Sequence, residues 1–243
     1  MSGRLVGVGV GPGDPALLTI KGREVLLRAD VVFVPVARES GPRDDGELGY
    51  AERVVLAHVS KPPRRLAFDL DPSQREAVWS EAGKEVAAVV AGGGTAAFAT
   101  IGDPNVYSTF SRITRVVRTL VPGTTIETVP GITAMQDLAS RSGTILVEGD
   151  ERLALLPFTS GENALREALD RFDTVVCYKG GRRLPDVVRV VQEAGRADEL
   201  VYGARLGLAG EEIRRFPMAD PAGETPAPPG AGPYLSTIIV TRS

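Results

Sequence analysis

The stretch TIGDPNVYSTF, residues 100–110, combines residue types that could bind a small molecule. Gly102 and Asp103 follow a run of small and apolar residues and precede a segment with helical periodicity. A glycine lets a ligand approach the backbone, and a carboxylate accepts hydrogen bonds from an amine or a hydroxyl. Ser108 and Thr109 add two hydroxyl groups. Because ligands of open parallel α/β sheets bind where strands end, the pattern indicates a binding loop, although an ordinary turn with Asp103 as a helix cap would share its first residues.

A second candidate loop, residues 7–13, is rich in glycine and lies between an apolar run and a helical segment. Asp30 follows at roughly the distance of an acid that binds a ribose, as in nicotinamide dinucleotide sites. The spacing argues against that motif, because the sixth position of GxGxxG is Pro12 or Asp14 instead of glycine. An acid at the start of the helix would also repel a pyrophosphate. We expect Asp14 to cap the helix that follows, whether or not it contacts a ligand.

The elements that must position these loops alternate between strands and helices, which predicts a parallel α/β architecture. The apolar run VVFVPV, residues 31–36, is typical of a strand that is buried on both faces. The pattern restarts after Pro157, so we expect two α/β domains, residues 1–156 and 157–243. Strands are expected at residues 4–10, 31–36, 94–101, 125–129, 174–178, 200–204 and 236–241, and helices at residues 19–28, 73–90, 110–120, 134–142, 163–172 and 185–194.

Length and composition narrow the function classes. The 243 residues carry a net charge of −3, so no basic field attracts nucleic acid. No run of about 18 apolar residues is present, and the first residues lack the pattern of a secretion signal. One cysteine, Cys177, and one histidine, His58, exclude an intrachain disulfide and a Cys/His zinc cluster. We therefore expect a cytoplasmic protein with no metal site of its own, no membrane contact and no nucleic-acid partner, in which His58 is a packing or surface residue.

The central stretch resembles the GDPxxYST signature of the tetrapyrrole methyltransferases that use S-adenosylmethionine. The first loop, VGVGPGDPALLT, is similar to the opening motif of that family, and VPGITA, residues 129–134, is similar to the loop after its next strand. The segment GDERL, residues 149–153, and Trp79 are similar to the family members that methylate carbon 20 of the macrocycle. The matches run from Val6 to Val240 and are looser in the second half.

The resemblance implies the tetrapyrrole methylase fold, in which two α/β domains have a deep cleft between them, and a homodimer. It implies that S-adenosylmethionine is the cofactor and that precorrin-2, or its cobalt-containing counterpart cobalt-factor II, is the substrate. The implied reaction is methyl transfer to carbon 20 in cobalamin biosynthesis. Three alternatives remain open: methylation of another position of the macrocycle, a nicotinamide-dependent oxidoreductase, and a tetrapyrrole carrier without activity.

The resemblance also implies which residues bind the cofactor. Two departures from the family pattern concern the tetrapyrrole side: Ala134-Met135 replaces a more usual Ser-Phe, and Arg112-Ile113 replaces Tyr-Leu. Lys179 also stands where relatives often carry methionine. The implied cofactor-binding residues are Pro12, Ile101, Gly102, Asp103, Val106, Tyr107, Thr133, Ala134, Lys179, Ala204, Arg205 and Thr237.

The substrate side is less sharply defined. A proton must leave the methylated carbon, and its acceptor is unknown, with Asp103, Tyr107 and Glu148 as candidates. Arginine suits the carboxylates of the substrate because it binds them bidentately. Arg112 is the preferred arginine because it follows the central motif by one helical turn, and Lys61, Arg64, Arg65 and Arg115 are the other basic candidates. The predicted substrate-binding residues are Asp14, Ser108, Thr109 and Arg112.

Overall fold

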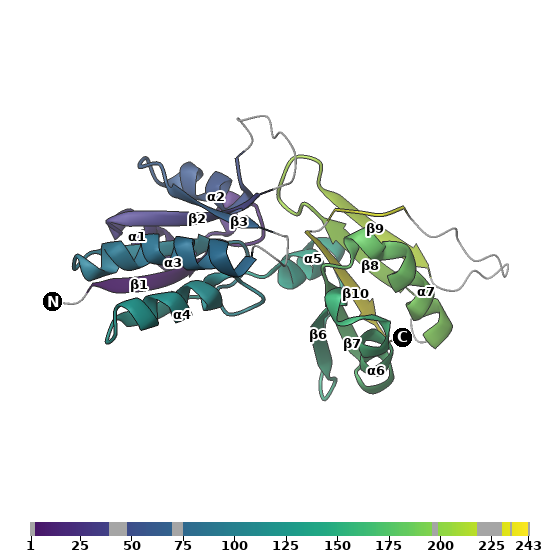
Figure 1. Cartoon of the computed structure of the whole chain (residues 1–243). Coiled ribbons are helices and arrows are strands. Elements are labelled where there is room, and N and C mark those ends of the chain that lie inside the picture. Colours follow the sequence, from purple (N-terminus) through teal and green to yellow (C-terminus); the bar gives the residue numbers. More distant parts are fainter. Residues whose placement is uncertain are drawn as a thin grey trace. The chain divides into compact units, whose positions relative to one another are not determined.

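The chain folds into two compact units, Met1–Thr133 and Ala134–Ser243, each built on its own five-stranded sheet (Figure 1). This computed structural model describes residues 3–38, 48–69, 75–195, 199–217, 230–233 and 235–242. Helices pack on the sheet in both units, which confirms the predicted α/β class with two domains. Within the described residues, no helix is both long and apolar enough to cross a membrane.

The first unit is an all-parallel α/β sheet. Its strands are β1 (Arg4–Gly9), β2 (Val31–Arg38), β3 (Arg64–Asp69), β4 (Thr95–Thr100) and β5 (Thr125–Val129), and its helices are α1 (Ile20–Arg28), α2 (Tyr50–His58), α3 (Arg75–Ala91) and α4 (Phe110–Leu120). The spatial order is β3-β2-β4-β1-β5, with every neighbouring pair parallel. Parallel pairs need crossover connections, and the helices supply them. The loops that follow β1, β4 and β5 therefore lie at the same edge of the sheet.

Alternating side chains of the first sheet build a core on each face. Leu5 and Phe98 pack against α3 and α4, whereas Val6 and Val8 pack against α1 and α2. The ring of Phe110, the first residue of α4, lies with its centroid 5.9 Å from that of Phe98. The continuous apolar runs of β1 and β4 follow from this burial on both faces.

The second unit is a mixed sheet with helices on both faces. Its strands are β6 (Leu153–Pro157), β7 (Thr174–Tyr178), β8 (Glu199–Ala204), β9 (Glu212–Pro217) and β10 (Ser236–Thr241), and its helices are α5 (Ala134–Ser142), α6 (Glu162–Arg171) and α7 (Leu184–Ala194). The order is β6-β7-β10-β8-β9, in which only the β6–β7 pair is parallel. The side chains of α6 and α7 cover one face, and those of α5 cover the other.

The division between the units lies upstream of the boundary expected after residue 156. Helix α5 buries Leu138 and Ala139 in one cluster with Val176, Val201 and Ile239 of the second sheet. Strand β6 pairs with β7, so it also belongs to that sheet. Residues 134–156 therefore join the second unit, because their apolar side chains and strand partners are there.

Candidate functional site

Three loops of the first unit are joined at the edge where β1, β4 and β5 end. The backbone N–H of Gly102 donates to the carbonyl of Gly11 at 2.8 Å, which links the central loop to the first glycine-rich loop. The N–H of Gly131 donates to Oδ2 of Asp103 at 3.0 Å, which links the central loop to the loop after β5. The structure thereby brings together the predicted residues Pro12, Ile101, Gly102, Asp103 and Thr133 within one unit.

Glycine is required where these loops touch. A Cβ atom on Gly9 would lie 2.5 Å from the nitrogen of Gly131 and 2.6 Å from the carbonyl oxygen of Gly102. A Cβ atom on Gly131 would collide with that same carbonyl oxygen and with the backbone of Gly9. Because all of these neighbours are backbone atoms, a side chain at either position would separate the loops.

Gly102 differs from these two glycines because it faces open space. Its φ of +66° belongs to the left-handed region, and an added Cβ would have only Thr133 Cα as a neighbour, at 4.0 Å. The loop therefore presents bare backbone, without a side chain, at the edge where strands end. Such a surface suits a ligand that is held by backbone groups.

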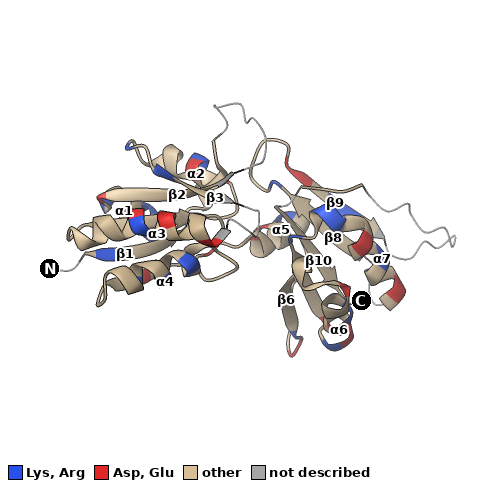
Figure 2. Ribbon diagram, viewed as in Figure 1, with Lys and Arg blue, Asp and Glu red and all other residues tan. Residues whose placement is uncertain are grey.

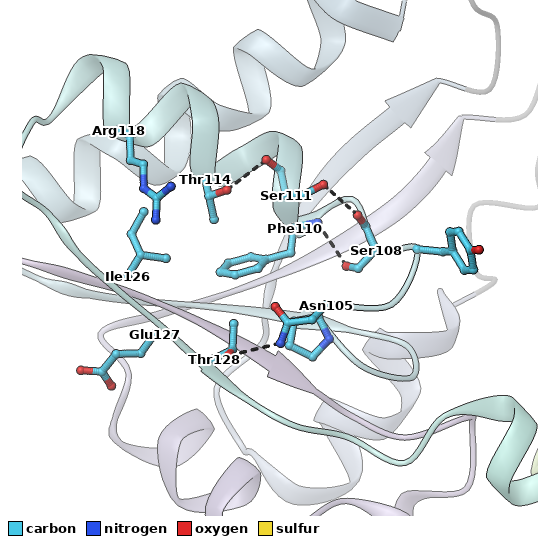
Figure 3. A pocket seen from close by; sticks show the side chains of 11 residues that line it. Asn105, Ser108, Phe110, Ser111, Thr114, Arg118, Ile126, Glu127 and Thr128 are labelled. Carbon is cyan, nitrogen blue, oxygen red and sulfur yellow. Dashed lines mark hydrogen bonds between the residues drawn. The ribbon is translucent and has the colours of Figure 1, made fainter. Parts of the chain in front are cut away.

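Asp103 cross-links loops and does not cap the helix. Its carboxylate is almost fully buried, with Oδ1 accepting from the N–H of Asn105 at 2.8 Å and Oδ2 accepting from Gly131. The N-cap position of α4 is Thr109, and Ser108, the residue before it, accepts from the N–H of Phe110 through its Oγ at 3.1 Å (Figure 3). Ser108 Oγ also lies 3.0 Å from Oγ1 of Thr100. The alternative in which Asp103 is an ordinary helix cap is therefore excluded.

A cavity of about 380 Å³ lies beside the central loop, between α4 and β5 (Figure 3). Asn105 bridges its two sides, because its Nδ2 donates to Oγ1 of Thr128 at 3.3 Å. The hydroxyl of Ser111 donates to the carbonyl of Ser108, just before α4, and that of Thr114 donates to the carbonyl of Ser111. The lining is thus polar but mostly engaged within the fold. It consists of Pro104, Asn105, Tyr107, Ser108, Phe110, Ser111, Thr114, Arg118, Ile126, Glu127 and Thr128.

Asp14 is a capping residue and His58 a packing residue, as predicted, but the helix that Asp14 caps is short and separate from α1. Asp14 Oδ1 accepts from the N–H of Ala16 at 2.8 Å and caps a short 3-10 helix, Pro15–Leu17. His58 Nε2 lies 2.9 Å from the carbonyl oxygen of Pro15, so His58 packs α2 against this helix. A separate helix, α1, then begins after Thr19, whose hydroxyl oxygen accepts from Gly22 N.

Two of the predicted basic residues, Arg65 and Lys61, are held by hydrogen bonds within the fold. Arg65 is held by Glu52, with 2.7 Å between Nε and Oε1, and this bond raises the pKa of Arg65. Lys61 donates to the carbonyl of Asp30, just before β2, so it lies at the edge of the sheet opposite the joined loops. These contacts argue against substrate binding by Arg65 and Lys61. Arg64 begins β3, and Arg115 lines a smaller cavity of about 280 Å³ between α3 and α4.

Arg112 keeps its charge at the surface and stacks on an aromatic ring. Its guanidinium carbon lies 4.8 Å from the centroid of Trp79, which extends from α3. Stacking on the ring limits the orientations of a planar, exposed guanidinium and leaves its edge donors available. The neighbouring Thr109 stands at the cap position of α4 without a side-chain capping bond.

In the second unit, the remaining predicted residues gather at one end of the sheet. The register of β10 places Thr237 between Tyr178 and Gly203, and it pairs Ser236 with Ala204. The N–H of Lys179 donates to the carbonyl of Ser236 at 3.3 Å. The N-terminus of α5 reaches the same end, because Met135 N donates to the hydroxyl oxygen of Tyr178 at 3.1 Å. Lys179, Ala204, Arg205, Thr237 and Ala134 are therefore neighbours.

Backbone strain marks both groups of residues independently of any motif. In the described part of the chain, the non-glycine residues with positive φ are Tyr107 at 48°, Lys179 at 62° and Arg205 at 51°. Residues other than glycine rarely adopt this backbone conformation, and such strain concentrates at functional sites. The sequence resemblance assigns all three residues to the cofactor site, and that assignment makes no use of backbone conformation.

The lone cysteine is not a reactive group. Cys177 lies in the core of the second unit, and burial raises the pKa of its thiol to about 12. A thiolate is the nucleophilic form, so Cys177 is inert at neutral pH. Within the described residues, no group of three or more His, Cys, Asp or Glu side chains is arranged to hold a metal ion.

A family model described as Tetrapyrrole (Corrin/Porphyrin) Methylases matches residues 4–222. The chain belongs to this family. The joined loops of the first unit and all three strained residues lie within the matched range, whereas Thr237 lies beyond it. The membership argues against the dinucleotide-dependent alternative, in agreement with the spacing of the first glycine-rich loop.

Similar proteins include members of the family with assigned names. The chain is 34% identical to a precorrin-2 C(20)-methyltransferase of Sinorhizobium sp, over 98% of this chain and 95% of that protein. It is 27% identical to a cobalt-precorrin-2 C(20)-methyltransferase of Salmonella typhimurium, over 100% of this chain and 98% of that protein. The fold is shared with a uroporphyrin-III C-methyl transferase from Thermus thermophilus complexed with S-adenyl homocysteine, at a TM-score of 0.66 and 22% identity, covering 98% of this chain and 97% of that chain.

Sequence reasoning missed the residues that hold the loops of this tetrapyrrole methylase together. The VPGITA motif marks its loop, but nothing in the motif shows that Gly131 must approach Gly9 and Gly102. Asn105 and Thr128 are also unmarked, although they connect the central loop to β5. The available signal was the glycine itself, because an unsubstituted position inside a short turn often indicates close backbone approach.

Proposed function

We propose that this tetrapyrrole methylase transfers a methyl group from S-adenosylmethionine to carbon 20 of precorrin-2 or of its cobalt-containing counterpart, in cobalamin biosynthesis. The observation that carries the proposal is the 34% identity to a precorrin-2 C(20)-methyltransferase across 98% of this chain. Relatives named for precorrin-2 and for cobalt-precorrin-2 are both similar along the whole chain, so the proposal covers both forms of the substrate. It includes a homodimer, which the family resemblance implies, and a location in the cytoplasm, which the single cysteine fits.

The cofactor-binding residues of the proposal come from both units. The bare backbone at Gly102 fits a bound molecule, because an added Cβ would enter open space there. The strained backbone of Tyr107, Lys179 and Arg205 supports binding by main-chain groups, because such conformations change the direction in which the backbone N–H and C=O groups point. The residues proposed to bind S-adenosylmethionine are Pro12, Ile101, Gly102, Asp103, Val106, Tyr107, Thr133, Ala134, Lys179, Ala204, Arg205 and Thr237.

The protein's main contribution to the reaction is alignment. S-adenosylmethionine supplies an electrophilic methyl group that an electron-rich carbon can attack directly, so little acid–base work is required. The joined loops fix the position of bound groups, and orientation of this kind can supply several kcal/mol of the barrier reduction. Asp103 serves here as a cross-link, since both of its oxygens accept backbone N–H groups. Tyr107, half-exposed on the same loop, is the second candidate for contact with the reacting groups.

The substrate-binding residues of the proposal are Asp14, Ser108, Thr109 and Arg112. Precorrin-2 carries several carboxylates, and the guanidinium of Arg112 is exposed, oriented by Trp79 and able to bind a carboxylate bidentately. Thr109 lies at the start of the same helix, and its side chain makes no capping bond. Ser108 and Asp14 contribute from positions that their own hydrogen bonds with backbone N–H groups fix.

Binding calorimetry tests the cofactor part of the proposal. We expect S-adenosylhomocysteine to bind the full chain at a single site, whereas NADH at the same concentrations should give no heat of binding. The physical reason is that the first loop lacks the glycine pattern for a pyrophosphate and carries Asp14 in its place. Tight binding of NADH with no binding of S-adenosylhomocysteine would contradict the proposal and favour an oxidoreductase.

A further inference from the structure

The connection between β8 and β9, residues 205–211, is a compact double turn that begins at a strained residue. The N–H of Leu208 donates to the carbonyl of Arg205 at 3.0 Å, and the N–H of Glu211 donates to the carbonyl of Leu208 at 3.0 Å. Arg205 has a φ of 51°, which is unfavourable for any residue with a side chain. Two local hydrogen bonds would not by themselves select this conformation over a relaxed one, so contacts from outside the turn are needed.

Arg141 of α5 supplies such a contact through Glu211, the last residue of the turn. Glu211 Oε2 accepts from the N–H of Gly207 at 2.6 Å, inside the turn. Its other oxygen accepts from Nη1 of Arg141 at 3.2 Å. Arg141 in turn donates from Nε to Oδ1 of the buried Asp137 at 2.9 Å. These charge-assisted bonds form a continuous chain from the first turns of α5 to the middle of the 205–211 turn.

Packing along the same path makes the attachment rigid. Leu206 is buried in one cluster with Leu138 and Ala139 of α5. The buried carboxylate of Asp137 fixes Arg141, since an ion pair with one buried partner has few alternative geometries. The Asp137–Arg141–Glu211 chain therefore lies beside an apolar contact that holds the same two segments together.

We propose that Glu211, held by Arg141, is a positioning residue that keeps the backbone of Ala204 and Arg205 in the conformation that binds S-adenosylmethionine. The inference rests on the proposed function, because these two residues matter for binding only if the protein uses that cofactor. Glu211 acts through the turn and not by its own contact with the methyl group. Its loss should therefore weaken cofactor binding without slowing methyl transfer in the fully loaded enzyme.

The variant Glu211→Ala tests this role while leaving the buried Asp137–Arg141 pair intact. We expect the dissociation constant for S-adenosylhomocysteine and the KM for S-adenosylmethionine to rise about tenfold, the range typical of one charge-assisted hydrogen bond. At saturating cofactor, kcat should stay within about twofold of the wild-type value. Glu211→Gln retains an oxygen that can accept from Gly207, so it should restore most of the affinity.

Arg189→Ala is the matched control in the same unit. Arg189 forms two comparable ion pairs, 2.7 Å to Glu162 and 3.0 Å to Glu193, on α6 and α7, where Figure 2 shows both signs of charge. It should leave cofactor affinity unchanged. If the wild type binds S-adenosylhomocysteine and Glu211→Ala binds it equally well, or if kcat falls while KM is unchanged, the inference is overturned. A wild-type protein that does not bind S-adenosylhomocysteine would overturn the proposed function, and this inference with it.

Discussion

The variant Gly131→Ala should lower the free energy of unfolding by about 3 kcal/mol and abolish measurable binding of S-adenosylhomocysteine. The added methyl group would collide with the carbonyl oxygen of Gly102 and with the backbone of Gly9. None of these atoms belongs to a flexible side chain, so relief requires the loops to separate. Separation would also break the bond from Gly131 N to Asp103. Urea denaturation and calorimetry measure the two effects.

Gly92→Ala is the control for this effect in the same unit. Gly92 follows α3, and an added Cβ would meet no atom closer than 3.5 Å, which is ordinary van der Waals contact. We expect its free energy of unfolding to stay within about 0.5 kcal/mol of the wild type. Equal stability and cofactor affinity in Gly131→Ala and Gly92→Ala would show that the three loops are not held together as described.

The variant Gly102→Ala should weaken binding of S-adenosylhomocysteine about tenfold to a hundredfold, with only a modest loss of stability. Its methyl group would occupy the open space above the loop, where we propose that the cofactor lies. Crowding of a close contact costs about 1–3 kcal/mol, which corresponds to that range of affinity. The left-handed φ of +66° adds a cost of about 1–2 kcal/mol to folding.

Gly143→Ala separates the loss of cofactor affinity from the loss of stability. Gly143 has the same φ of +66°, and an added Cβ would have no neighbour within 4 Å. It follows α5 at the end opposite to the predicted residue Ala134, so it should lose stability as Gly102→Ala does but keep full cofactor affinity. Equal affinity in the two variants would contradict the placement of the cofactor at Gly102.

The central strands could be predicted from the sequence because they are buried on both faces. The apolar runs of β1, β2, β4 and β10 have no polar alternation, which sets them apart from surface segments. The edge strands β3, β6 and β9 were missed. Strands β3 and β9 each pair with one neighbour only and carry adjacent arginines, Arg64-Arg65 in β3 and Arg214-Arg215 in β9. Charged, half-exposed sequences of this kind resemble loops until the neighbouring strand is known.

In the candidate site too, features that depend on consecutive residues could be predicted, and features that depend on distant contacts could not. Motifs predicted the loops at residues 102–109 and 130–134, because the residues that form a turn are consecutive in the sequence. They did not predict what Asp103 does, since its partner Gly131 is far away along the chain. Nor did any pattern mark Glu211, whose role depends on Arg141 of another element. Contacts between distant segments require the fold, and these contacts fix the geometry of the loops.

The most direct test of the central claim is the structure of the methylated product. Purified protein would receive methyl-labelled S-adenosylmethionine and precorrin-2 in the absence of oxygen, with the cobalt-containing form in a parallel sample. Mass spectrometry and carbon NMR would then count and locate the new methyl group. We expect one added methyl, at carbon 20, from at least one of the two substrates. A methyl at another carbon would contradict the assigned position, and no transfer to either substrate by a protein that binds the cofactor would contradict the activity itself.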